Sequence, residues 1–143
     1  MDNVSVMLEM KEINMEIFKA VSKRYKSKEI GVTPAQGRII MYIYDSPDEV
    51  CQKDIERHIS VAKSTISTIL NTMEKNNLIV RKCIDGDLRR NVITLTEKSL
   101  KVADMLRNDE KYFDEILLSG VSYEELQNFY RILGKIRKNI ERI

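Results

Sequence analysis

Residues that could bind nucleic acid gather in one stretch of this 143-residue sequence, between about Val50 and Thr96. Its centre is a segment predicted to be helical, 62–76, whose exposed side is expected to carry one lysine and a run of hydroxyls. These are Lys63, Ser64, Thr65, Ser67 and Thr68. A lysine can donate to a guanine edge or a phosphate, and hydroxyls can reach bases or phosphates. These side chains indicate recognition of a nucleic acid. Asn71, one turn later, is a further expected phosphate contact.

A basic segment follows this helix, arranged as two short β-branched runs around Asp85-Gly86-Asp87. That pattern predicts an antiparallel hairpin with a charged tip. Its basic residues are Arg81, Lys82, Arg89 and Arg90. Arginine is favoured where a narrow minor groove deepens the negative potential. Asp87 lies two residues before Arg89, a spacing at which its carboxylate could brace the guanidinium. The alternative is that these charges and hydroxyls form only a solvated surface.

The elements that must position these residues follow from the apolar periodicity. The sequence predicts helices at 4–27, from Thr33-Pro34 to about Asp45, 51–58, 62–76, 97–118 and from Ser122 to the end, with strands at 78–84 and 91–96. The hairpin is the only β-structure expected. The predicted fold is mainly α, in the order α-α-α-α-β-β-α-α. A helix pair followed by a basic hairpin is typical of a winged helix-turn-helix, whose second helix enters the major groove.

Composition excludes several other classes of protein. Two cysteines without a CxxC pair indicate neither a disulfide framework nor a structural zinc site, and a reducing, cytoplasmic setting is expected. No signal peptide or membrane span is predicted. With one histidine and no glycine-rich phosphate loop, no catalytic constellation emerges. We therefore expect no enzyme activity, no metal and no cofactor.

The chain resembles the MarR family of bacterial transcription regulators. The likeness covers 33–106 by motif and essentially the whole chain by helix order. The motifs that carry it are Thr33-Pro34-Ala35-Gln36, Gln52-Lys53-Asp54-Ile55, Val61-Ala62-Lys63-Ser64-Thr65-Ile66-Ser67, Met73-Glu74-Lys75-Asn76-Asn77-Leu78-Ile79, Asp87-Leu88-Arg89-Arg90 and Leu95-Thr96-Glu97-Lys98.

The resemblance implies a single domain, 1–143, with a winged-helix DNA-binding core at 33–96 and dimerisation helices at 4–27 and 97–143. It implies a homodimer on a pseudo-palindromic operator in double-stranded DNA. The implied function is that of a repressor released by a small-molecule effector or other signal. It maps the wing arginine onto Arg89 and its bracing aspartate onto Asp87. The predicted DNA-contacting set is Lys53, Lys63, Ser64, Thr65, Ser67, Thr68, Arg81, Lys82, Arg89 and Arg90.

The sequence departs from the family pattern at four positions. Ala62 stands where an acidic residue often caps the recognition helix, and Thr68 stands where arginine is frequent. Asn77 and Ser99 stand where glycine is frequent. These departures predict a base readout that differs from that of better-known family members. They are not expected to change the fold.

Apolar stripes on the terminal helices predict the dimer interface. Its expected residues are Met7, Ile13, Ile17, Leu126, Phe129, Leu133, Ile136 and Ile140. Packing against a second subunit would create a dimer with two-fold symmetry, which can recognise a pseudo-palindromic DNA site. The alternative is that the stripes pack on each other within one monomer.

Two questions stay open at this stage. Cys51, near a helix start, and Cys83, after two basic residues, are placed where a reactive thiolate is favoured, so either could sense redox state; the alternative is that both are ordinary structural residues. The second question concerns function: the same winged helix could instead be a module that binds protein without nucleic acid.

Overall fold

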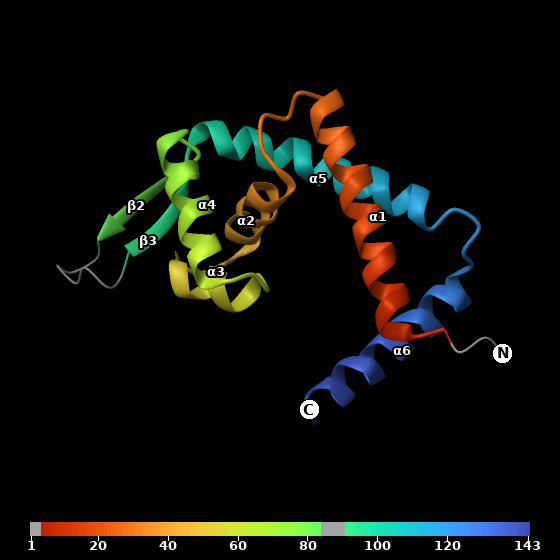
Figure 1. The fold of residues 1–143 in the computed structure, drawn as a ribbon. Coiled ribbons are helices and arrows are strands. Elements are labelled where there is room, and N and C mark those ends of the chain that lie inside the picture. The colour runs from red at the N-terminus through yellow and green to blue at the C-terminus, as the bar shows by residue number, and fades with distance from the viewer. Residues whose placement is uncertain (1–3, 84–90) are drawn as a thin grey trace. The chain divides into compact units, whose positions relative to one another are not determined.

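The computed structural model describes residues 4–83 and 91–143, and Figure 1 labels their helices and strands. The elements are α1 (Val6–Ser27), α2 (Pro34–Asp45), β1 (Val50–Cys51), α3 (Gln52–His58), α4 (Lys63–Lys75), β2 (Ile79–Cys83), β3 (Asn91–Leu95), α5 (Glu97–Leu117) and α6 (Tyr123–Ile140). The predicted mainly helical fold and the order of its helices and hairpin strands are confirmed.

The contacts divide the chain into two compact units, residues 1–108 and 109–143. The first holds the helix-turn-helix, the sheet, α1, α2 and the start of α5. The second holds the rest of α5 and all of α6. Each unit is described by itself below.

The sheet of the first unit contains a strand that the sequence did not predict. Its order is β1-β3-β2, and both pairings are antiparallel. Ile93 of β3 lies between Val50 of β1 and Arg81 of β2. The expectation that the hairpin is the only β-structure is therefore wrong. A strand of two residues is too short to show an alternating pattern, so its pairing becomes visible only in the folded chain.

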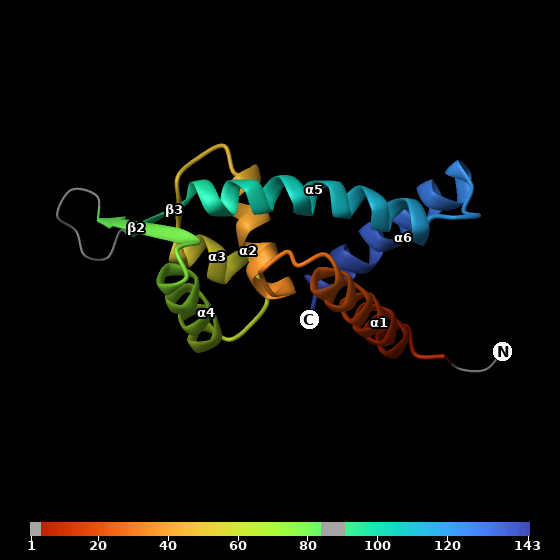
Figure 2. The ribbon, with the colours of Figure 1, turned by 90° about the horizontal axis from the view of Figure 1, so that it is seen from above.

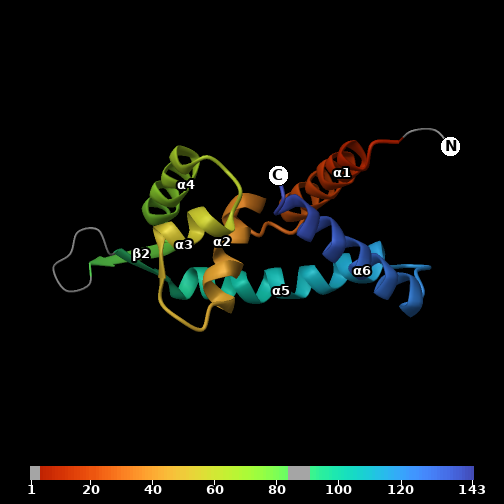
Figure 3. The same cartoon turned by 90° about the horizontal axis from the view of Figure 1, so that it is seen from below.

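Helix α2 lies at the centre of the first unit, between α4 and the first part of α5 (Figures 2 and 3). It begins as predicted: Thr33 accepts a hydrogen bond from the backbone of Gln36, whose side chain accepts one from Thr33 in return, and Pro34 occupies the first turn. Ile39 and Ile40 are completely buried. They belong to one apolar core with residues of α3, α4, β3 and α5, including Ile55, Leu70, Ile93 and Leu106.

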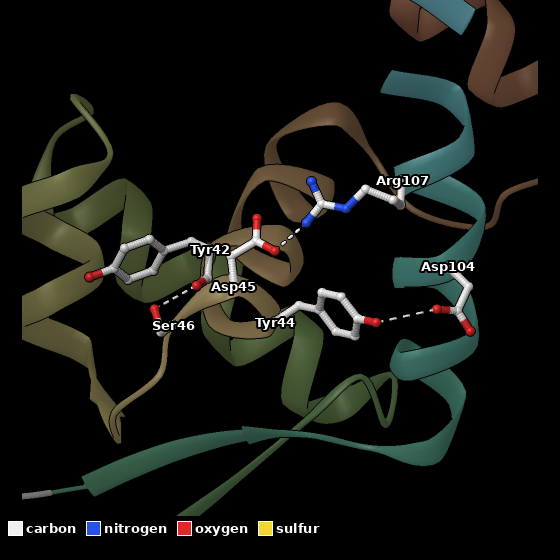
Figure 4. A network of polar contacts seen from close by, with 6 residues as sticks. All are labelled: Tyr42, Tyr44, Asp45, Ser46, Asp104 and Arg107. Carbon is white, nitrogen blue, oxygen red and sulfur yellow. Dashed lines mark hydrogen bonds and ion pairs between the residues drawn. The ribbon is translucent and has the colours of Figure 1, made fainter. Parts of the chain in front are cut away.

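Polar contacts attach the end of α2 to α5 (Figure 4). Asp45 pairs with Arg107, and the Tyr44 hydroxyl donates to Asp104 at 3.5 Å. Ser46, which follows the helix, donates to the carbonyl of Tyr42 at 2.6 Å. These contacts fix where α2 ends, next to the strand and helix that lead into α4.

The second unit is built around α6. Ser122 accepts a hydrogen bond from the Glu125 backbone, and the Glu125 carboxylate accepts one from the Ser122 backbone, so the helix begins with a capping box. No residue of α6 is fully buried, although the helix is amphipathic. Within the parts of the chain that the structure describes, no helix is long and apolar enough to cross a membrane.

Candidate nucleic-acid interface

Helix α4 has one buried face and one exposed face. Ile66, Leu70 and Met73 are completely buried in the core. The opposite face exposes Lys63, Ser64, Thr65 and Thr68, all predicted DNA contacts. No carboxylate occurs on α4 before Glu74. This face therefore offers a cation, hydroxyl groups and no negative charge over its first three turns.

The start of α4 lacks a side-chain cap, as the sequence predicts. Ala62 is the N-cap residue, and its methyl side chain cannot accept a hydrogen bond from the first turn. The backbone N–H groups of Thr65 and Ile66 bond to the Ala62 carbonyl, while the N–H groups before them have no helical partner. A helix start that is exposed and uncapped favours an anion such as phosphate.

Ser67 belongs to α4, faces α3 and is only partly exposed. The Gln52 side-chain amide of α3 donates to Ser67 Oγ at 2.9 Å and to Glu56 Oε1 at 3.0 Å. This places Ser67 in a contact that joins the two helices of the helix-turn-helix. Gln52 lies outside the predicted set, and only the fold brings it to Ser67.

Thr68 uses its hydroxyl hydrogen within its own helix. Thr68 Oγ1 donates to the Ser64 carbonyl at 3.0 Å, and Thr72 donates in the same way to Thr68. The side chain of Thr68 is still exposed, so its methyl group and its oxygen lone pairs can meet a partner. This suits contact with a thymine methyl or acceptance from a base amino group.

Arg81 differs from the other predicted contacts because it binds to α4. Its Nη2 donates to Asn71 Oδ1 at 3.0 Å, and its Nε lies 3.3 Å from Glu74 Oε2. The side chain of Arg81 is 22% exposed and that of Glu74 is 49% exposed. Asn71, predicted as a phosphate contact, is thus also part of the link between β2 and α4.

Lys82 and Lys53 are both exposed, on β2 and α3 respectively. Lys82 is the next residue after Arg81, so the two side chains point to opposite faces of the strand. Asp87, Arg89 and Arg90 lie outside the described residues, and their predicted roles remain predictions.

The start of α3 is fixed by Asp54. Its Oδ2 accepts from the Cys51 backbone at 2.9 Å and from Cys51 Sγ at 3.0 Å. The backbone hydrogen bond from Cys51, followed by the side-chain bond, lowers the pKa of the Asp54 carboxyl below its ordinary value of 3.8. Cys51 is half-buried and acts as a donor in this cap, a structural role. Cys83 is exposed at the end of β2.

A cavity of about 440 Å³ lies inside the first unit, next to the inner side of α4, which is called the reading helix below. Its walls come from α1, α2, the turn between α3 and α4, and α4 itself. Most of the lining is apolar, and Asn14, Tyr25 and Arg38 contribute the polar groups. Ile66 and Ile69 of α4 form part of the wall, so an occupant of this cavity would touch the back of that helix.

The described residues contain no group of three or more histidine, cysteine or acidic residues that could hold a metal ion. His58 stacks on Tyr42, with ring centroids 4.3 Å apart. His58 is the last residue of α3, and this stacking gives it a packing role.

Comparisons with known proteins agree with this arrangement. Residues 30–90 match the sequence model of the MarR family. The chain is 28% identical over 115 residues to the helix-turn-helix transcriptional regulator YybA of Bacillus subtilis, covering 80% of this chain and 76% of that protein.

Two solved structures of similar fold were determined with DNA. One is the MepR–DNA complex of S. aureus, at 22% identity, with a TM-score of 0.84 and coverage of 98% of this chain and 99% of that one. The other is a MarR-family regulator of Listeria monocytogenes with a 26mer DNA, at 18% identity, with a TM-score of 0.83 and coverage of 96% and 89%. At these identities the likeness shows the fold, and it confirms the predicted winged helix-turn-helix.

The similarity to transcription regulators agrees with the expectation that the chain is not an enzyme. The winged fold, the matched segment and the similar regulator lead to one conclusion: the chain is similar to the MarR family of winged helix-turn-helix transcription regulators, whose sequence model matches residues 30–90.

Proposed function

We propose that this protein is a sequence-specific regulator that places α4 in the major groove of double-stranded DNA. The observation that carries the proposal is the exposed face of α4, which presents Lys63, Ser64, Thr65 and Thr68 opposite a fully buried face. The two similar structures with DNA support it. Lys53 and Lys82 flank this helix as phosphate contacts, and Arg89 and Arg90 remain predicted wing contacts, with Asp87 as the brace of Arg89.

The first experiment is selection of bound duplexes from random-sequence DNA, followed by titration of the selected duplex. Lys63→Gln is expected to weaken binding by about 1–3 kcal/mol, the range for loss of a good base contact. The matched control is Lys101→Gln, which removes an equally exposed lysine from α5. Failure of the wild-type protein to bind any duplex at low salt would overturn the proposal and would favour a module that binds protein.

The functional unit of this proposal is a homodimer that reads a pseudo-palindromic operator. The helices at 4–27 and 97–143 supply the interface. Several of the predicted interface residues are strongly exposed in the single chain: Met7 is 75% exposed, Ile13 53%, Phe129 54% and Ile140 59%. Ile17, Leu126, Leu133 and Ile136 are half-buried. Exposed apolar surface on this scale marks an interaction site, and a second copy is the partner that gives two reading helices.

The regulatory part of the proposal is repression that ends when a small molecule enters the cavity behind α4. The apolar lining with a few polar groups suits a small aromatic compound, such as a phenol. Because Ile66 and Ile69 line the cavity, an occupant can shift the helix that reads DNA.

The protein contains no tryptophan, so Phe18→Trp at the cavity wall supplies a single fluorescent reporter. A phenol that changes this fluorescence and also releases the selected duplex would support the mechanism. Fluorescence change without release would separate binding from regulation and contradict it.

A further inference from the structure

We propose that Arg81 is a positioning residue that holds the reading helix against the wing and is not itself a DNA contact. The inference rests on the proposed DNA-binding function. It concerns the link that Arg81 of β2 makes with Asn71 and Glu74 of α4, which nothing in the family likeness assigns.

The geometry of the link favours a fixed guanidinium. Asn71 and Glu74 are three residues apart and therefore lie on one face of α4. Arg81 reaches one with Nη2 at 3.0 Å and the other with Nε at 3.3 Å. The hydrogen bond to Asn71 orients the planar group, and the carboxylate of Glu74 lies beside its Nε as an ion-pair partner without a hydrogen bond.

The backbone of Arg81 is equally constrained. Arg81 lies in the middle of β2, and its Cα pairs with that of Ile93, a residue buried in the core. Ile79 shares its face of the strand and is buried as well, since side chains two residues apart point to the same side. Arg81 therefore extends from a rigid strand towards α4. Its link with Asn71 and Glu74, called the Arg81 tie below, connects two elements that would both have to fit the same DNA.

The tie also sets the charge of α4. Glu74 is the first carboxylate on the helix, and its pairing with Arg81 offsets a negative charge on an element proposed to approach phosphates. A phosphate competing for Arg81 would leave Glu74 without this partner. This charge arrangement separates the two roles experimentally, because they predict opposite effects of removing Glu74.

The experiment compares Arg81→Gln, Glu74→Gln and the double variant, with Lys82→Gln as the neighbouring phosphate-contact reference. The probe is the duplex selected from random DNA, titrated at several salt concentrations. If Arg81 positions α4, Arg81→Gln and Glu74→Gln each weaken binding about tenfold, the double variant is no worse than either, and the salt slope stays unchanged. Lys82→Gln lowers that slope by about one phosphate equivalent.

A phosphate contact by Arg81 would give the opposite result. Arg81→Gln would then lower the salt slope by about one phosphate equivalent, and Glu74→Gln would tighten binding because a repulsive charge is lost. That outcome overturns the inference and leaves the proposed function standing. Absence of binding by the wild-type protein overturns the proposed function and, with it, the positioning role.

A DNA-free measurement checks the tie itself. Urea unfolding of the wild-type protein, Arg81→Gln, Glu74→Gln and the double variant forms a double-mutant cycle for Arg81 and Glu74. The tie requires that the two substitutions are not additive, whereas additive effects contradict it.

Discussion

The side chain of Gln52 joins the two helices of the helix-turn-helix by donating to Ser67 Oγ at 2.9 Å. The same amide donates to Glu56 on its own helix, so the orientation of Gln52 is fixed before it reaches α4. Together with the proposed Arg81 tie from β2, this contact means that α4 is held by polar links from two different neighbours. Its buried apolar face fixes its depth in the core, and these links fix its rotation and tilt.

Removing the α3–α4 contact should weaken both folding and DNA binding. Ser67→Ala leaves the Gln52 amide with Glu56 as its remaining partner, and we expect a loss of about 1 kcal/mol in the free energy of unfolding. Ser64→Ala is the matched control, since Ser64 is exposed and one turn nearer the helix start. Urea titration measures both variants. Equal effects of the two substitutions would show that the Gln52 contact contributes nothing specific.

Gly37 permits close packing of α1 and α5 on α2. A Cβ at this position would lie 3.0 Å from Tyr25 Oη, 3.2 Å from Tyr25 Cε2 and 3.4 Å from Leu106 Cδ1. We expect Gly37→Ala to lower the free energy of unfolding by about 1 kcal/mol, because overpacking outweighs the gain in helix propensity. Gly134→Ala is the control, since a Cβ there meets no atom within 4 Å among the described residues. The control should be more stable than wild type. A gain of the same size for Gly37→Ala would contradict the packing described here.

Asp54 should contribute a pH-dependent part of the stability. Its pKa is lowered in the folded protein, first by the backbone hydrogen bond from Cys51. The ionised carboxylate therefore stabilises the fold above the ordinary value of 3.8, and this contribution is lost as the pH falls below 3.8 and through the lower folded value. Asp54→Asn should be less stable than wild type at neutral pH and should lose less stability on acidification. Thermal unfolding between neutral and acid pH tests this. Asp48→Asn, which removes an exposed carboxylate outside the cap, is the control, and its stability should change with pH in the same way as that of wild type.

Local signals in the sequence predict the elements of this fold well. Thr33-Pro34 with Gln36 and Ser122 with Glu125 mark two helix starts that form as capping boxes. Asn77, which follows the end of α4, adopts the left-handed conformation with φ of 60°, and asparagine tolerates this conformation better than most residues. These features depend on residues within a few positions of each other, so sequence alone contains the necessary information.

Contacts between distant elements are harder to predict. Gln52 and Ser67 are fifteen positions apart and Asn71 and Arg81 ten, and neither pair follows from periodicity or capping rules. One signal for Arg81 was available: it alternates in step with Ile79, so it shares the side of β2 that faces the core. Arginine at such a position indicates a partner within the fold. A count of basic residues on the wing overlooks this.

The last prediction concerns assembly. Phe129→Glu places a charge on the exposed apolar face of α6, where Phe129 is 54% exposed, and we expect it to convert a dimer into a monomer of 16.7 kDa. Val80→Glu is the control, because Val80 is 39% exposed on β2 and lies outside both ranges proposed to supply the interface. Sedimentation equilibrium gives the mass of each variant. The Phe129→Glu monomer should also lose most of its affinity for a duplex with two half-sites, since only one reading helix can then bind, while its affinity for a single half-site stays close to that of one wild-type subunit. A wild-type protein that sediments as a monomer, or a Phe129→Glu variant that stays dimeric, would show that α6 packs by another arrangement.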